Sequence, residues 1–189
     1  MRGALCGRRE GEGEGVVSSK RNPNANDLWQ TPSDLRELIH RFVWKMDFER
    51  LTLDPATTQE NPMGAEFIRT PECDPDGLET EWFHLLHEDA RFVYVNPPYR
   101  KAWYSKIFLE ATRMAAAAPG CHMLALLPAK PGTKYFGQLV ESASANLFIT
   151  GRLTFQGATE PATFESALMY WGNKRHHFAV AFEELGWVI

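Results

Sequence analysis

Residues 91–127, RFVYVNPPYRKAWYSKIFLEATRMAAAAPGCHMLALL, predict a strand, a helix and a second strand in that order. Residues 91–95 are mostly β-branched and aromatic, which is typical of a strand, and the two prolines that follow end it. A helix is expected over residues 101–118, terminated by the Pro-Gly pair that comes next. Residues 122–127 are continuously apolar, as in a parallel strand buried on both faces. The unit therefore indicates an α/β fold.

The segments on both sides continue this alternation. Residues 31–46 predict a helix, because Thr31 can cap it, Pro32 suits its first position, and apolar residues follow at helical spacing. A short strand over residues 51–54 ends at Asp54, where a proline stops it. Further elements are expected as helices over 80–86 and 133–143 and as strands near 67–68 and over 147–150, 153–155, 166–171 and 178–182, with the rest of 57–79 mostly loop.

This order of elements predicts a doubly wound, mostly parallel sheet. The last two predicted strands, 166–171 and 178–182, lack a helix-length segment between them, so they are expected to pair as an antiparallel C-terminal hairpin. In doubly wound sheets, ligands lie beyond the carboxyl ends of the strands. Asp54 and Asn96 each follow a predicted strand, so both side chains are expected to face one crevice.

Length and composition fit one globular domain behind an N-terminal tail. The chain has 189 residues, of which 44% are apolar and 23% charged. Residues 1–26 interleave glycine with arginine and glutamate, so we expect a disordered tail there and the folded domain over residues 27–189. No apolar run approaches the roughly 20 residues that cross a bilayer, and no secretory signal is visible. We therefore expect a cytoplasmic protein with no membrane partner.

The three cysteines and the net charge narrow the function classes. The cysteines lie far apart without a CxxC pair, which argues against a disulfide framework and against a structural metal site. The net charge is −4, and residues 1–26 carry +2, so residues 27–189 carry −6. Any surface that contacts DNA must then be a local basic patch, and the net charge alone favours a small-molecule or protein substrate.

The four residues Asn96-Pro97-Pro98-Tyr99 carry the clearest chemical signal. Two consecutive prolines cannot donate backbone hydrogen bonds, so they fix a rigid turn from which Asn96 and Tyr99 project. The Asn96 side-chain carbonyl and a main-chain carbonyl of Asn96 or Pro97 would match the two hydrogens of a planar primary amine. Tyr99 adds an aromatic face on which a planar ring can stack. The alternative is a tight turn at a strand end, where Asn and Pro are common.

An aryl amine is a poor nucleophile, because its lone pair is delocalised into the ring. Two acceptors outside the ring plane would favour a pyramidal nitrogen whose lone pair points at an electrophile. Positioning and stabilisation of the developing charge then provide the rate, and no strong base is needed before attack. A base inside a duplex could be reached only if it were flipped out.

These residues, together with several other segments, resemble the phage-type DNA adenine methyltransferases. The resemblance spans about Asp27 to Trp171, and its segments occur in the order of that family. Besides Asn96-Pro97-Pro98-Tyr99 after Phe92-Val93-Tyr94-Val95, they are Asp27-Leu28-Trp29-Gln30-Thr31-Pro32, Leu53-Asp54-Pro55-Ala56, Asp76-Gly77-Leu78 with Trp82, Leu127-Pro128-Ala129, and Gly151-Arg152-Leu153-Thr154-Phe155.

The resemblance implies a Rossmann-like methyltransferase sheet, S-adenosylmethionine as cofactor and double-stranded DNA as partner. It implies action as a site-specific enzyme, in the host cell cytoplasm if the gene belongs to a phage, and a monomer is expected. The cofactor pocket would be bordered by Thr31, Pro32, Asp54, Pro55 and Ala56, with Asp76 near the adenosine, and the adenine would be held by Asn96, Pro97, Pro98 and Tyr99. Arg152 and Phe155 would lie on the substrate side.

Several of these residues also have purely structural interpretations. Asp54 could serve only as a strand-end turn residue, and Asp76 could initiate a turn with the glycine that follows it. Arg100 and Lys101 directly follow the Asn-Pro-Pro-Tyr motif, so they could contact DNA phosphates or simply form a charged helix face.

The sequence departs from the family pattern in one stretch and lacks a loop common to other methyltransferases. Lys130-Pro131-Gly132-Thr133 replaces a family stretch that has an arginine and an aspartate before the threonine, which could alter activity. No glycine-rich loop follows Asp54, as is often true of the phage-type family. Two alternatives stay open. One is methylation of another planar amine or amide, such as a protein glutamine or an RNA base, although those enzymes usually carry the glycine-rich loop. The other is a catalytically degenerate DNA-binding relative, which the altered stretch and the acidic surface would fit.

Overall fold

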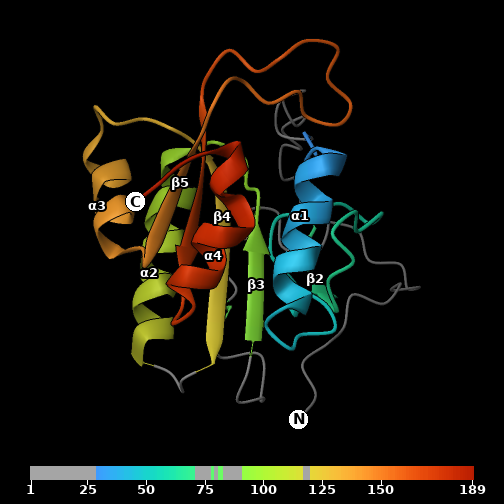
Figure 1. Ribbon diagram of the computed structural model, residues 1–189, viewed down its shortest axis with the longest axis vertical. Coiled ribbons are helices and arrows are strands. Elements are labelled where there is room, and N and C mark those ends of the chain that lie inside the picture. Colours follow the sequence, from blue (N-terminus) through green and yellow to red (C-terminus); the bar gives the residue numbers. More distant parts are fainter. Residues whose placement is uncertain (1–28, 71–77, 79–80, 83–90, 117–119) are drawn as a thin grey trace, which may run out of the picture.

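The computed structural model describes residues 29–70, 78, 81–82, 91–116 and 120–189 (Figure 1). The predictions for the tail, for Asp76 and for most of the helix at 80–86 lie outside these residues. The strands are β1 (Leu53–Asp54), β2 (Phe67–Ile68), β3 (Arg91–Val95), β4 (Cys121–Pro128), β5 (Ala145–Ile149), β6 (Ser166–Trp171) and β7 (Gly186–Val188). The helices are α1 (Ser33–Trp44), α2 (Lys101–Ala116), α3 (Lys134–Ser142) and α4 (Arg175–Phe182), followed by the 3-10 turn η2 (Glu183–Leu185).

The seven strands within the described residues form one sheet, in the order β2-β1-β3-β4-β6-β5-β7. β1 pairs in parallel with β2 and β3, and β3 pairs in parallel with β4. β6 is antiparallel to both β4 and β5, so β5 runs in the same direction as β4, and β7 is antiparallel to β5. Five strands therefore share one direction, and the predicted Rossmann-like sheet with antiparallel C-terminal strands is confirmed.

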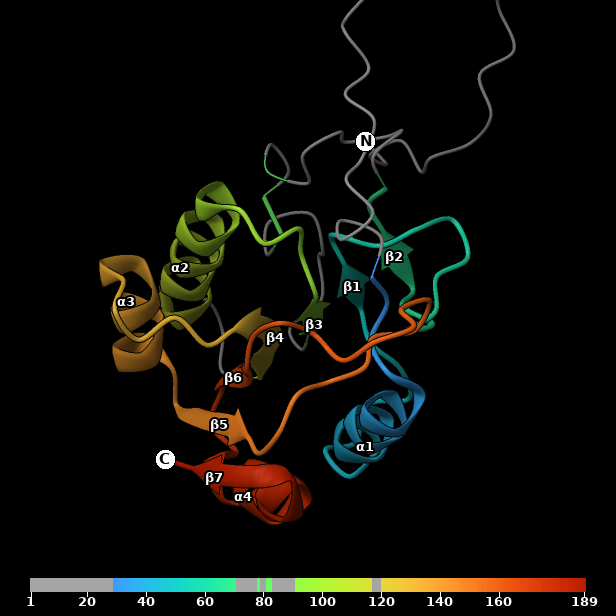
Figure 2. The ribbon, with the colours of Figure 1, turned by 90° about the horizontal axis from the view of Figure 1, so that it is seen from above.

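Helices cover both faces of the sheet, α1 and α4 on one side and α2 and α3 on the other (Figure 2). Side chains of β3 alternate between these layers: Phe92 and Tyr94 belong to the core under α1 and α4, whereas Val93 and Val95 belong to the core under α2 and α3. This double burial explains why the strands next to the site consist almost entirely of apolar residues.

The core under α1 is centred on one aromatic ring. The centroid of Phe42 lies 5.4–6.0 Å from the ring centroids of Phe92, Tyr170, Phe178 and Phe182, all at steep angles. Edge-to-face packing of this kind is the favoured geometry for aromatic pairs. It clamps α1 and α4 to the sheet, so the chain segment that enters α1 is held at the carboxyl edge of the sheet.

The prediction of a strand over residues 178–182 was wrong, because this segment is the end of α4. Phe178 and Phe182 are both fully buried, and Val180 between them is 52% exposed. A spacing of four residues brings the two phenylalanines onto one helix face. Since all five residues from 178 to 182 are apolar, their pattern alone could not distinguish a helix from a strand.

The prediction of a strand over residues 153–155 was also wrong. These residues lie in the loop between β5 and β6. The β-type pairing of this loop is an isolated bridge between Gln30 and Gln156. The strand at the outer edge of the sheet, antiparallel to β5, is β7, which was not predicted from the sequence. β7 has only three residues, too few to show an alternating pattern.

The start of α1 differs from the prediction in one respect. Pro32 occupies the N-cap position, no side chain caps the helix, and the hydroxyl of Thr31 is used elsewhere. The other predicted helices and strands within the described residues are confirmed within about two residues, as expected for element boundaries. Within the part of the chain that the structure describes, no helix is both long and apolar enough to cross a membrane.

Candidate active site at the carboxyl edge of the sheet

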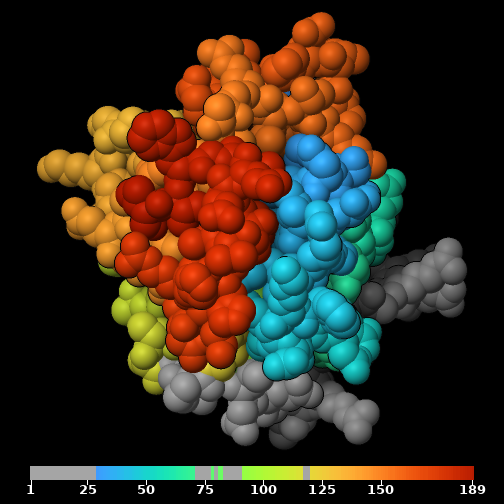
Figure 3. Space-filling view, in the orientation of Figure 1, coloured from blue at the N-terminus to red at the C-terminus, as the bar shows by residue number. Residues whose placement is uncertain are grey.

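Two of the predicted site segments leave the sheet at the same edge. β1 ends at Asp54 and β3 ends at Val95, and these parallel neighbours are in register through Leu53 and Val93. Asp54 and Asn96 therefore emerge at the carboxyl edge, as the sequence predicted. The loop formed by residues 150–165 rises beyond this edge and reaches over to the start of α1 (Figures 1 and 2). The space-filling view shows it as a protruding body above α1 (Figure 3).

The side-chain amide of Asn96 is held by two hydrogen bonds. Its Nδ2 donates to the main-chain carbonyl of Trp29 over 3.1 Å, and its Oδ1 accepts from the hydroxyl of Tyr99 over 2.9 Å. Pro97 is buried, and Pro98 accepts a 2.7 Å bond from the backbone N–H of Arg100, which closes the turn. The rigid turn predicted from the two prolines thus presents a fixed amide group.

Tyr99 belongs to a group of four rings, Trp29, Tyr99, Phe155 and Phe164, which we name the aromatic cluster. Trp29 stacks on Phe155 with a centroid separation of 5.3 Å and an interplanar angle of 13°. Tyr99 meets Phe164 edge-on at 5.3 Å and lies 6.2 Å from Phe155. Burial raises the pKa of Tyr99 well above its ordinary value, so its hydroxyl keeps its proton and donates to Asn96.

Asp54 is a buried carboxylate beside the motif. Its side chain is 3% exposed, and it accepts a 3.2 Å hydrogen bond from the backbone N–H of Ala56. Burial raises the pKa of Asp54 to about 7, although hydrogen bonds from Ala56 and Thr57 oppose the increase. No ion pair to Asp54 occurs among the described residues. A buried acceptor without a cationic partner is a suitable partner for a donor on a ligand.

A second buried polar pair lies in the same region. The hydroxyls of Thr31 and Tyr94 are 2.5 Å apart, and both side chains are buried. Burial raises the pKa of Tyr94 above its ordinary value, and the nearby Asp54 carboxylate raises it further. Tyr94 was not among the site residues predicted from the sequence, although a phenol inside a buried strand needs a hydrogen-bond partner, which is a signal for such a role.

The remaining predicted site residues divide into buried and exposed groups. Pro32 and Pro55 are buried and Ala56 is half-buried, near Thr31 and Asp54 in the chain. Phe155 is 1% exposed, inside the aromatic cluster. The exposed residues are Arg100, Lys101 and Arg152, the last 3.6 Å from Glu165 across the loop of residues 150–165. The structure thus brings Phe155 to Tyr99 and leaves Arg152 on the surface of the same loop.

The stretch that departs from the family pattern forms a closed turn after β4. The main-chain carbonyl of Lys130 accepts from the backbone N–H of Thr133 over 3.0 Å and from its hydroxyl over 2.8 Å. Gly132 is exposed, and the Lys130 ammonium lies 5.9 Å from the centroid of the Tyr104 ring. The polar groups of this turn are therefore bonded within the turn itself. The helix α3 begins at the next residue, Lys134.

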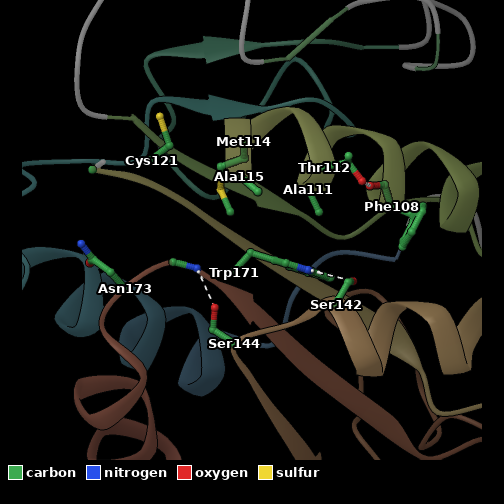
Figure 4. Close-up of a pocket in the computed structure, with 12 residues that line it drawn as sticks. Phe108, Ala111, Thr112, Met114, Ala115, Cys121, Ser142, Ser144, Trp171 and Asn173 are labelled. Carbon is green, nitrogen blue, oxygen red and sulfur yellow. Dashed lines mark hydrogen bonds between the residues drawn. The ribbon is translucent and has the colours of Figure 1, made fainter. Parts of the chain in front are cut away.

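A cavity of about 550 Å³ lies at the opposite edge of the sheet (Figure 4). Its lining includes Cys121, where β4 begins, and Trp171, where the antiparallel β6 ends. The indole N–H of Trp171 donates to Ser142, and Ser144 accepts from the backbone N–H of Gly172. None of the predicted site residues that the structure describes lines this cavity.

Comparison with protein families gave one match over most of the chain. A family model described as DNA N-6-adenine-methyltransferase (Dam) matches residues 18–179. The matched range includes β1 to β6 and every site residue predicted from the sequence. Comparison with curated proteins gave no match.

Proposed function

The chain belongs to the DNA N-6-adenine-methyltransferase family, and on that premise we propose that it transfers a methyl group from S-adenosylmethionine to a flipped adenine in double-stranded DNA. The observation that carries this proposal is the fixed amide of Asn96 beside the ring of Tyr99 at the carboxyl edge of the sheet. Bound S-adenosylmethionine would supply a methyl group on a sulfonium centre, which is electrophilic enough to react with a neutral amine.

Asn96 and Pro97 would hold the reacting amine. Asn96 Nδ2 already donates to Trp29, so Oδ1 is the atom that faces away from that bond and can accept an N–H. The main-chain carbonyl of Asn96 or Pro97 would accept the second N–H, which leaves the nitrogen lone pair free to react. As the nitrogen becomes positively charged, both acceptors bind its hydrogens more strongly, and this difference lowers the barrier.

Tyr99 and Phe155 would form the walls against which the flipped base packs. Their ring centroids are 6.2 Å apart, and Phe164 contacts Tyr99 from the side. A planar base could insert beside Tyr99 after a modest shift of the loop of residues 150–165. Base–aromatic stacking offsets part of the cost of removing adenine from the duplex.

The residues at the end of β1 fit the proposed cofactor. Asp54 is buried, has no cationic partner among the described residues, and has a pKa of about 7. A hydroxyl or amine donor on the cofactor would satisfy this carboxylate and keep it ionised. Thr31, Pro32, Pro55 and Ala56 would contribute the surrounding surface, and Asp76 would contact the adenosine.

Replacing Asp54 with asparagine should have opposite effects on stability and cofactor binding. Because the folded-state pKa is raised, ionisation of Asp54 costs stability as the pH rises from about 4 through about 7. Asp54→Asn should therefore raise the unfolding temperature at pH 8, with a smaller gain near pH 4. Loss of the charged acceptor should weaken S-adenosylmethionine binding by about tenfold or more. Calorimetry and thermal unfolding measure both effects, and unchanged cofactor affinity would argue against this role.

Arg100 and Lys101 would contact DNA phosphates, since both are exposed at the start of α2 next to the motif. Reversing both charges to glutamate should weaken DNA binding and flatten the dependence of log affinity on log salt by about one to two units. Binding titrations at several salt concentrations measure the slope. The matched control is Arg41→Glu with Lys45→Glu. These two exposed cations lie at the C-terminal end of α1. Equal slopes in both double variants would refute phosphate contact by Arg100 and Lys101.

The substrate class can be tested by offering labelled S-adenosylmethionine together with duplex DNA, RNA or total protein. Label incorporated into duplex DNA is the expected result. Label in RNA or protein, with none in DNA, would replace this proposal by the same amine chemistry on another substrate.

A further inference from the structure

Trp29 contacts both the catalytic amide and the loop of residues 150–165. It precedes α1 and belongs to no helix or strand. Its main-chain carbonyl accepts the Asn96 amide hydrogen over 3.1 Å, and its ring stacks on Phe155 at 5.3 Å. Tyr99 also contacts Asn96 and Phe155, but its ring is tilted by 59° to that of Phe155, whereas the Trp29 ring stacks on Phe155 at 13°.

The carbonyl of Trp29 determines which way the Asn96 amide points. A carbonyl can only accept, so it selects Nδ2 as its partner. The hydroxyl of Tyr99, on the other side, can donate or accept and therefore tolerates either orientation of the amide. If the amide rotated by half a turn, two acceptors would face each other at Trp29, and an NH₂ group would be presented where the substrate amine must bind.

Three contacts hold this carbonyl in place. The Trp29 ring is stacked on Phe155 and lies 6.3 Å from Phe164, so it is enclosed by the loop between β5 and β6. The next residue, Gln30, accepts a 2.9 Å hydrogen bond from the backbone N–H of Gln156 in the same loop. The orientation of the amide thus depends on packing between segments more than 120 residues apart in sequence.

We propose that Trp29 is a positioning residue for methyl transfer: its carbonyl orients the Asn96 amide, and its ring, stacked on Phe155, fixes the carbonyl. This inference rests on the proposed function, since it assumes that Asn96 Oδ1 receives the substrate amine. The stacked ring of Trp29 would thus affect the rate of methyl transfer itself and not the binding of the cofactor or of DNA.

Steady-state kinetics on duplex DNA can test this role with three variants. Trp29→Ala removes the stacking and should lower kcat by at least about tenfold, with KM for DNA and for S-adenosylmethionine changed by less than about threefold. Trp29→Phe keeps an aromatic ring against Phe155 and should recover most of kcat. Trp44→Ala, which removes a 71% exposed tryptophan on α1, should leave kcat unchanged.

Thermal unfolding of each variant separates loss of positioning from loss of the fold. A Trp29→Ala protein that melts near the wild-type temperature and keeps its kcat would overturn the proposal. So would a loss confined to KM, or a loss in Trp29→Phe equal to that in Trp29→Ala. If the wild-type protein methylates no DNA, the proposed function itself fails, which is a different outcome.

A double-mutant cycle with Asn96→Asp keeps the proposal testable even if Trp29→Ala is unstable at high temperature. A carboxylate cannot donate to the Trp29 carbonyl, so Asn96→Asp should lower the single-turnover rate in the wild-type background. Once Trp29→Ala has released the carbonyl, the same substitution should cost about fivefold less. Additive effects of the two substitutions would mean that Trp29 and Asn96 act independently and would refute the proposal.

Discussion

Replacing Asn96 with alanine is expected to lower kcat for methyl transfer by about 100- to 1000-fold. The substitution removes the acceptor for the substrate amine and nothing that the core requires. Its two partners, the Trp29 carbonyl and the Tyr99 hydroxyl, belong to half-buried residues and not to the fully buried core. The unfolding temperature should therefore change little.

The measurement is the rate of label transfer from S-adenosylmethionine to DNA at saturating concentrations of both. Asn173→Ala is the matched control, because Asn173 is exposed beside the cavity at the opposite edge of the sheet. Its rate should equal that of the wild type. An Asn96→Ala protein with more than about a tenth of the wild-type rate would rule out the amide as the main acceptor.

Replacing Tyr99 with alanine is expected to lower kcat/KM for DNA by about 10- to 100-fold, because the base loses its stacking surface. The same change also opens the aromatic cluster, since Tyr99 contacts Phe155 and Phe164. Tyr99→Phe keeps the ring and loses only the hydroxyl bond to Asn96, so its loss should be several times smaller.

Comparing kcat/KM for DNA between Tyr99→Ala and Tyr99→Phe tests whether the ring of Tyr99 stacks on the base. Tyr135→Ala, at a half-buried tyrosine on α3, controls for removal of an aromatic side chain outside the site. If Tyr99→Phe is as impaired as Tyr99→Ala, the hydroxyl and not the ring is what matters. Wild-type kcat/KM in Tyr99→Ala would remove the base-stacking role altogether.

The sequence predicted the elements whose signals are local and strong. β3 and β4 follow from runs of apolar and aromatic residues, and the prolines after Asn96 mark where β3 ends. The juxtaposition of Asp54 and Asn96 followed from a general rule, because parallel strands bring their carboxyl ends to one edge. The family resemblance seen in the sequence agrees with the match to the family model.

What the sequence could not predict depends on contacts between distant segments. Thr31 has the chemistry of a helix cap, but burial against Tyr94 gives its hydroxyl another partner. Phe155 looks like a strand residue, yet stacking on Trp29 buries it in a loop. In both cases the local structure depends on a partner more than 60 residues away in the sequence. Propensity and spacing within a short segment cannot reveal such a partner.

Exposed basic side chains near the proposed site bear on how an acidic chain could attract DNA. Residues 27–189 carry −6, so attraction of DNA cannot come from the whole protein. Arg100 and Lys101 are exposed next to the Asn-Pro-Pro-Tyr turn, and Arg152 is exposed on the loop of residues 150–165. A small basic patch around the proposed base pocket would position DNA while leaving most of the surface acidic.

Methylation of adenine in DNA by the Asn96 turn can be measured in living cells. The wild-type chain and Asn96→Ala are expressed in cells without adenine methylation of their own, and the DNA is sequenced with a method that detects N6-methyladenine. The wild-type chain should produce N6-methyladenine at defined sites, and Asn96→Ala at equal protein level should produce almost none. Absence of N6-methyladenine with the wild-type chain would show that the chain does not methylate adenine in DNA. Equal methylation with both proteins would show that Asn96 is not needed for the reaction.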